Sequence, residues 1–195
     1  MEQAFPENLP LFYLLNVGPS ANPLTVQLAL FLASQLILGL IAGLVLLWFA
    51  GTSQARAALM RAGVGLGLAM ALNLIIATAI FVPRPYMLGI GQALMVHGPD
   101  SSFPSDHGSF FWSLGLGLML GWPLRLLGVG IALAGFAVAW ARIYLGVHFP
   151  LDFVGSMAIA LICVGVARRL SGWCEPRIFV PVERLHQTFL AKVRR

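Results

Sequence analysis

Two histidines and one aspartate in this sequence have the types and spacing needed for attack on phosphorus. His148 and Asp152 are four positions apart, so on a helix that begins near Phe149 they lie close to one face. There the carboxylate can hold one imidazole nitrogen, and an oriented imidazole is a nucleophile or a base. His107 supplies a second imidazole, so one histidine can attack while the other protonates the departing oxygen.

Arg84 and Arg142 carry the groups for binding an anion. A guanidinium makes paired, charge-assisted hydrogen bonds to phosphate oxygens that lysine cannot copy. Ser105 is expected to cap a helix, which directs the backbone N–H groups of His107 and Gly108 outward at the positive end of the helix dipole. These groups together predict a phosphate site.

A metal site is the rival interpretation. Four residues of metal-ligating type lie in the same segments: Asp106, His107, His148 and Asp152. Two arginines in one cluster would repel a cation, and no second pair of carboxylates is available. We therefore expect no metal and no other cofactor. Structural ion pairs that hold helix ends are the plainer alternative, and the convergence of three segments argues against it.

The composition indicates an integral membrane protein. Of the 195 residues, 59% are hydrophobic and only 10% are charged, whereas average proteins carry about 25% charged residues. Five uncharged runs predict membrane-spanning helices: Pro23–Ala50, Ala62–Phe81, Gly108–Leu124, Leu126–Ala141 and Phe153–Ala167. A short apolar segment, Leu11–Leu15, is expected to lie on the membrane surface. The predicted fold class is an all-α helical bundle of about five transmembrane helices with a short N-terminal interfacial helix.

The positions of the basic residues predict the orientation. Ten of the 12 lysines and arginines fall on one side of the five spans, and only Arg84 and Arg142 fall on the other. By the positive-inside rule the basic side is cytoplasmic, so the phosphate site is outside and the C-terminus inside. The net charge of +5 then reflects orientation in the membrane and not binding of nucleic acid. We expect one membrane-embedded domain, residues 1–195, with a basic cytoplasmic tail at 176–195.

Three segments on the predicted outer face resemble a known signature. They are Pro83-Arg84-Pro85, Pro104-Ser105-Asp106-His107-Gly108 and Arg142-x5-His148-x3-Asp152. They resemble the signature of the type-2 phosphatidic acid phosphatase superfamily, which reads Lys-x6-Arg-Pro, Pro-Ser-Gly-His and Ser-Arg-x5-His-x3-Asp. The combined match extends from the second predicted span to the start of the fifth.

The resemblance implies a metal-independent phosphohydrolase. In it His148 is the nucleophile, Asp152 orients His148, and His107 is the acid. The phosphate contacts that it implies come from Arg84, Arg142, Ser105 and the Gly108 N–H.

Three positions depart from the signature. Ala77 stands where the family has Lys, Asp106 replaces the Gly of the second segment, and Ala141 replaces the Ser before Arg142. The missing Lys removes one phosphate contact. Asp106 is unfavourable beside a phosphate unless it pairs with an arginine or is protonated, so it is interpreted as a modulator that suits a different leaving group.

Two stretches, Phe103–His107 and Gly146–Asp152, are similar to the undecaprenyl-diphosphatase branch of that superfamily. The similarity implies hydrolysis of undecaprenyl diphosphate to undecaprenyl phosphate through a phosphohistidine. It places the site at the periplasmic face of a bacterial inner membrane, in cell wall biogenesis. Three alternatives stay open: a lipid phosphotransferase with the same nucleophile, a phosphatidate or phosphatidylglycerol phosphate phosphatase, and a non-catalytic lipid-headgroup binder or translocator. The sequence leaves the oligomeric state open.

Two polar residues outside the motifs, His97 and Asn73, also bear on the predicted function. His97, in the outer loop between the first two segments, is expected to be an exposed loop histidine and not a catalytic one. Asn73 is the main polar residue within the predicted spans. Because a translocator should place more polar groups at mid-membrane in broken helices, this scarcity favours an enzyme.

Overall fold

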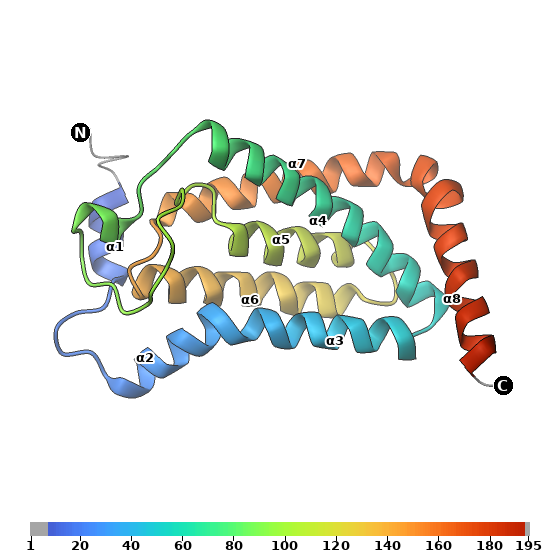
Figure 1. Cartoon of the computed structure of the whole chain (residues 1–195), viewed down its shortest axis with the longest axis horizontal. Helices are drawn as coiled ribbons and strands as arrows, with labels where there is room; N and C mark the ends of the chain where they lie inside the picture. Colours follow the sequence, from blue (N-terminus) through green and yellow to red (C-terminus); the bar gives the residue numbers. More distant parts are fainter. Residues whose placement is uncertain (1–7, 194–195) are drawn as a thin grey trace.

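A computed structural model describes residues 8–193, and every regular element in that range is helical. The long helices lie side by side along one axis (Figure 1). In chain order the elements are α1 (Asn8–Leu15), α2 (Pro23–Leu30), η1 (Phe31–Gln35), α3 (Leu36–Ala50), α4 (Ser53–Ala79), η2 (Pro85–Leu88), α5 (Asp106–Met119), α6 (Arg125–Tyr144), α7 (Pro150–Cys174), η3 (Glu175–Phe179) and α8 (Val180–Val193). The prediction of an all-α bundle is confirmed.

Four stretches are long and apolar enough to cross a membrane. They are Pro23–Ala50, Ser53–Ala79, Arg125–Tyr144 and Pro150–Lys192. α5 is the fifth helix of the bundle, and with 14 residues it is only about 21 Å long. It packs against α4, α6 and α7, so neighbouring helices cover much of its surface. The central position of α5 holds its N-terminus, which carries two of the predicted site residues, at one end of the bundle.

Three helices, α4, α6 and α7, extend beyond the uncharged runs that predicted them, whereas α5 ends at Met119, before the predicted Leu124. α4 begins at Ser53, nine residues before the expected start, and Thr52 caps it by accepting a hydrogen bond from the Ala55 N–H at 3.2 Å. α6 contains Arg142 and α7 contains Asp152 within their helical turns. Both helices therefore continue past the predicted runs Leu126–Ala141 and Phe153–Ala167 and include a buried ionisable side chain.

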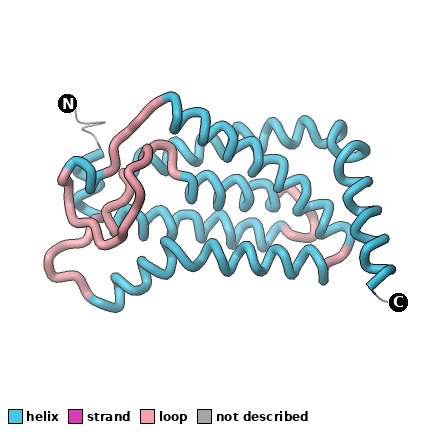
Figure 2. The backbone as a smooth tube through the Cα atoms, in the orientation of Figure 1, coloured by secondary structure: helices cyan, strands magenta, loops and turns pink. Residues whose placement is uncertain are grey.

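The short N-terminal helix is present as α1, Asn8–Leu15, at the end of the bundle where the long loops gather (Figure 2). Its Phe12 is fully buried and packs on Phe149, with 5.3 Å between the ring centroids. Tyr13 and Leu14 are exposed. The Asn8 side chain accepts a hydrogen bond from the Leu151 N–H at 2.9 Å. Helix α1 thus fixes the segment that leads into α7.

The predicted basic tail is helical as far as the structure describes it. α7 continues through η3 into α8, which turns away from the bundle (Figure 1). On α8, Glu183 accepts two hydrogen bonds from Arg56, at 2.7 and 2.6 Å. His186 packs against Trp48 and Phe49. Residues 194 and 195 of the predicted tail lie outside the described range.

A pair of glycine substitutions tests the packing of α5 on α6. A Cβ at Gly115 would lie 2.7 Å from the Ala132 backbone nitrogen, whereas a Cβ at Gly130 meets nothing within 4 Å. Gly115→Ala should therefore lower stability by about 1–3 kcal/mol, and Gly130→Ala should leave it unchanged or raise it slightly. Thermal unfolding of the purified proteins in detergent measures both. Equal melting temperatures would contradict this helix contact.

Candidate active site

The three sequence segments meet at the loop end of the bundle. The guanidinium of Arg84 contacts the His148 ring, with 3.0 Å between Nη1 and Nε2. The guanidinium of Arg142 contacts the His107 ring, with 3.2 Å between Nη1 and Nε2. All four side chains come from different elements: the loop after α4, the loop after α6, the end of α6 and the start of α5. The structure thus brings together the two imidazoles and both arginines.

His148 and Asp152 form a buried pair. The His148 Nδ1 lies 3.0 Å from the Asp152 Oδ2, and the two side chains are 2% and 0% exposed. The same oxygen accepts hydrogen bonds from the Phe149 N–H at 2.8 Å and from the Ser102 hydroxyl. α7 begins at Pro150, one residue after the expected start near Phe149. The predicted four-residue pairing is confirmed.

The contact with Arg84 fixes the tautomer of His148. A guanidinium can only donate, so the Nε2 of His148 accepts and carries a lone pair, while Nδ1 carries the proton and donates to Asp152. Burial, then the charges of Arg142 and Arg84, hold the pKa of His148 well below its ordinary value. A neutral ring with its lone pair on Nε2 is the form that a nucleophilic histidine requires.

Arg84 is held by partners in two loops, the one before α5 and the one before α7. Its Nε donates to the Asp100 carboxylate at 2.8 Å, and its Nη1 donates to the Val147 carbonyl at 2.9 Å. Nη2 donates to the Ser101 carbonyl at 3.2 Å. Although burial opposes it, the Arg84 guanidinium lowers the pKa of Asp100 below its ordinary value. Asp100 is therefore an anionic partner that positions Arg84, a role the sequence motifs did not indicate.

Arg142 is buried, 1% exposed, near the end of α6. Its Nη1 donates to the Ala33 carbonyl at 3.0 Å as well as to His107. Ala33 lies in η1, the π-helical turn that interrupts the first long helix. Within residues 8–193, the Arg142 Nε is buried and has no hydrogen-bond partner. A bound anion can use this donor.

Ser105 caps α5 as predicted, and the cap changes the role expected for Gly108. The Ser105 Oγ accepts from the Gly108 N–H at 3.4 Å, so this N–H is directed at the cap instead of pointing freely outward. A Cβ at Gly108 would lie 2.9 Å from both Phe153 and Ser156 side-chain atoms. Gly108 is thus needed for close packing of α5 on α7, and any phosphate contact to its N–H competes with the cap.

Asp106 pairs with an amide and not with an arginine. The Asn73 Nδ2 donates to the Asp106 Oδ1 at 2.5 Å, and the Asn73 Oδ1 accepts from the Ser109 hydroxyl at 2.7 Å. Asn73 is fully buried on α4, while Asp106 is exposed at the start of α5. Of the two conditions given above, pairing with an arginine is not met in the structure, because Asn73 faces the first turn of α5.

The interpretation of His97 as an exposed loop histidine is wrong. Its side chain is 21% exposed, and its Nδ1 lies 3.3 Å from the Asp100 Oδ1. Its ring centroid is 6.5 Å from that of His148. The Tyr86 hydroxyl donates to the backbone carbonyls of His97 and Gly98, which folds this loop over the site. Burial, then the charge of Arg84, lowers the pKa of His97.

Three site residues were thus not indicated by the motifs: His97, Asp100 and Ser102. All three lie in the loop that joins η2 to α5, where helical spacing gives no guide to proximity. Two features of the sequence could have indicated these residues: the spacing of His97 and Asp100, and the serines at 101 and 102 shortly before the second motif.

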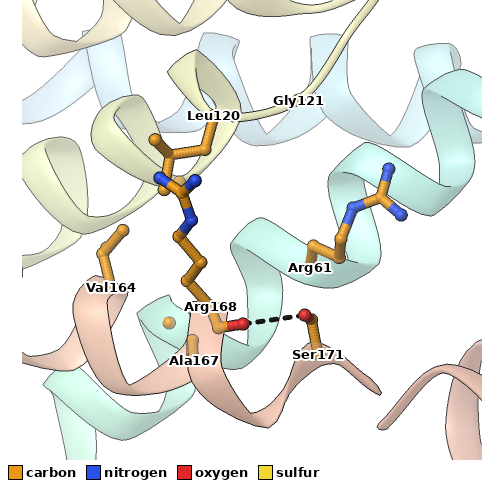
Figure 3. A pocket seen from close by; sticks show the side chains of 9 residues that line it. Arg61, Leu120, Gly121, Val164, Ala167, Arg168 and Ser171 are labelled. Carbon is orange, nitrogen blue, oxygen red and sulfur yellow. Dashed lines mark hydrogen bonds between the residues drawn. The ribbon is translucent and has the colours of Figure 1, made fainter.

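A cavity of about 220 Å³ lies at the other end of the bundle (Figure 3). Its lining contains no histidine and no carboxylate: Arg61, Gly65, Gly117, Leu120, Gly121, Val164, Ala167, Arg168 and Ser171. The cavity therefore lacks a nucleophile with a neighbouring carboxylate to orient it. The phosphate chemistry therefore belongs to the loop end.

The chain is similar to several known proteins. The family model described as the PAP2 superfamily matches residues 58–175. YbjG of Escherichia coli (strain K12), named provisionally as an undecaprenyl-diphosphatase, is 32% identical over 189 residues, which cover 91% of this chain and 95% of that protein. BcrC of Bacillus subtilis (strain 168), named as an undecaprenyl-diphosphatase, is 28% identical over 177 residues, which cover 88% of each. The crystal structure of Aquifex aeolicus LpxE superimposes with a TM-score of 0.65 at 25% identity, covering 87% of this chain and 99% of that one.

The Ser102 hydroxyl gives a direct test of the buried pair. Ser102→Ala removes one donor from Asp152 without changing the charge of the site. A hydrogen bond to a charged group contributes about 1.5–3 kcal/mol, so kcat for phosphate release should fall roughly 10- to 100-fold while KM changes little. Ser113→Ala is the matched control, because Ser113 is also buried but lies in α5 with no hydrogen-bond partner among the described residues. An unchanged kcat for Ser102→Ala would rule out this role.

Proposed function

Because this chain belongs to the PAP2 superfamily, we propose that it hydrolyses the diphosphate of a polyprenyl lipid, undecaprenyl diphosphate, through a phosphohistidine on His148. The protein is a membrane phosphatase. The single observation that carries the proposal is the state of His148: Nδ1 donates to the buried Asp152 carboxylate, and Nε2 accepts from Arg84. A lone pair is thus presented beside a guanidinium that can bind phosphate oxygens.

Substrate binding uses the two arginines. The terminal phosphate takes the place of the His148 ring as an acceptor from the Arg84 Nη1, which frees the Nε2 lone pair. The unpartnered Nε of Arg142 donates to a second phosphate oxygen. Both arginines are already held by backbone carbonyls, those of Val147 and Ala33, so little reorganisation is needed as charge develops.

The reaction proceeds in two displacements. In the first, the His148 Nε2 forms a bond to the terminal phosphorus, and the bond from that phosphorus to the bridging oxygen breaks. The bound diphosphate takes the place of the His107 ring as an acceptor from Arg142, and beside this anion the His107 ring is protonated. His107 then donates its proton to the departing oxygen, and Asp152 stabilises the positive charge that develops on His148. In the second displacement, water attacks the phosphorus, the bond from phosphorus to the His148 Nε2 breaks, His107 takes the proton from the water, and inorganic phosphate leaves.

The chemistry of the leaving group and the similar proteins favour a diphosphate lipid as the substrate. The departing group is then a lipid phosphate, which is less basic than the alkoxide released from a phosphate monoester. Its departure therefore depends less on the proton that His107 donates. The two relatives named above as undecaprenyl-diphosphatases match most of this chain. The site also lies at the ends of membrane-crossing helices, where a phosphate can stay at headgroup depth while its chain stays in lipid.

The proposed orientation places the active site at the periplasmic face of a bacterial inner membrane. The basic residues Arg61, Arg125, Arg168 and Arg169 lie toward the end of the bundle opposite the site. By the positive-inside rule that end is cytoplasmic, and α8 lies there too.

A panel of lipids tests the substrate assignment. Purified protein in mixed micelles is given undecaprenyl diphosphate, phosphatidate or phosphatidylglycerol phosphate, and released phosphate and lipid products are measured, with His148→Ala as the background. We expect undecaprenyl diphosphate to be turned over at least about 10-fold faster than either glycerolipid, because its departing group is the less basic. The product should be undecaprenyl phosphate.

Two outcomes would contradict this assignment in different ways. Faster turnover of a glycerolipid would change the substrate and leave the chemistry intact. Appearance of a second lipid that carries new phosphate would make the protein a phosphotransferase.

A further inference from the structure

The cavity at the end of the bundle opposite the active site has two arginines on its wall. Arg61 comes from α4 and Arg168 from α7, and the floor is formed partly by Gly117 and Gly121 near the end of α5. In Figure 3 the Arg168 side chain extends toward Leu120, whereas the Arg61 side chain extends from its helix in a different direction. Asp152 and Arg168 are 16 residues apart on α7, which corresponds to about 24 Å along the helix. The cavity is therefore separate from the catalytic residues.

Neither arginine has an anionic partner within residues 8–193. No carboxylate lines the cavity, and the ion pairs of the described chain leave out both Arg61 and Arg168. Arg56 differs from these two arginines. It lies only five residues before Arg61 on α4, but it is paired with Glu183 at 2.6 Å. The protein thus neutralises one arginine at this end and leaves two facing a shared cavity.

Close helix packing gives this cavity fixed walls. A Cβ at Gly117 would lie 2.8 Å from the Ala62 Cα, and one at Gly65 would lie 3.2 Å from a Val164 methyl. Backbones that approach this closely cannot move further together, so the cavity is not closed by a small shift of the helices. Apart from Ser171, the rest of the lining is glycine or apolar, with Leu120, Val164 and Ala167 among the lining residues.

We propose that this cavity binds the phosphate group of an anionic phospholipid from the leaflet on that side. Two guanidinium groups suit phosphate oxygens, and basic pockets between transmembrane helices are suited to anionic lipid head groups. The apolar residues beside them suit the glycerol and the first carbons of the acyl chains, which a free phosphate ion lacks. The ligand class is therefore a phospholipid with net negative charge, and phosphatidylglycerol serves as the probe.

The test compares two neighbouring arginines on α7. Arg168→Gln removes one guanidinium of the cavity, whereas Arg169→Gln removes the same charge one residue away, outside the lining. Both side chains are exposed, so neither change should impair folding, and thermal unfolding checks this. Delipidated protein is titrated with phosphatidylglycerol, phosphatidylcholine or inorganic phosphate, and bound lipid is counted by native mass spectrometry.

We expect wild type and Arg169→Gln to bind one phosphatidylglycerol per chain with similar affinity, and phosphatidylcholine at least about 10-fold more weakly. Arg168→Gln should lose about 5- to 10-fold in affinity, and Arg61→Gln with Arg168→Gln should lose more. Equal losses of affinity in Arg168→Gln and Arg169→Gln would contradict the site, because the loss would then reflect the overall positive charge of this end and not the cavity. If millimolar inorganic phosphate displaced the lipid, the ligand of the cavity would be free phosphate and not a phospholipid, and the proposal would be wrong. None of these outcomes depends on the proposed hydrolysis.

Discussion

A buried carboxylate holds the active end of this protein together. The Asp152 Oδ2 accepts from the His148 ring, from the Phe149 N–H and from the Ser102 hydroxyl. Its own backbone carbonyl accepts from the Ser105 N–H at 3.3 Å. One residue thus joins the start of α7, the loop before α5 and the cap of α5. Because an unpaired buried charge is costly, loss of any of these donors weakens this geometry, and the same carboxylate orients the His148 ring that we propose as the nucleophile.

Arg84 and Arg142 extend this constraint to the rest of the bundle. Arg84 ties the loop after α4 to the carbonyls of Ser101 and Val147, and Arg142 ties α6 to the Ala33 carbonyl in the first long helix. The π-helical turn η1 coincides with that last contact, as such turns often coincide with functional sites. Both guanidinium groups also contact a histidine. Folding and the proposed binding of phosphate therefore use the same two side chains, which accounts for arginines that are buried in so apolar a protein.

The sequence predicted the parts of this arrangement that follow from periodicity and short spacing. Apolar runs indicated the helices, and a separation of four residues placed His148 beside Asp152 at a helix start. Ser105 was recognisable as a cap from its type and position. The helix ends were predicted less well because Arg142 and Asp152 are buried inside helices and held by hydrogen bonds, so a charged residue did not mark the end of a helix. His97, Asp100 and Ser102 were missed because they lie in a loop whose fold depends on Tyr86 and Arg84, and no local pattern reports such contacts. The Asn73–Asp106 pair likewise joins two helices whose register the sequence does not reveal.

Attack of the His148 Nε2 on phosphorus leaves a phosphorylated enzyme that can be trapped. Undecaprenyl diphosphate labelled with ³²P in its terminal phosphate is mixed with excess protein, and the reaction is quenched with base during a single turnover. We expect protein-bound label that is stable in base, labile in acid, and located on the peptide that contains His148. The label should appear before free phosphate does. Release of phosphate with no labelled protein, or label on the peptide of His97 or His107, would contradict this mechanism.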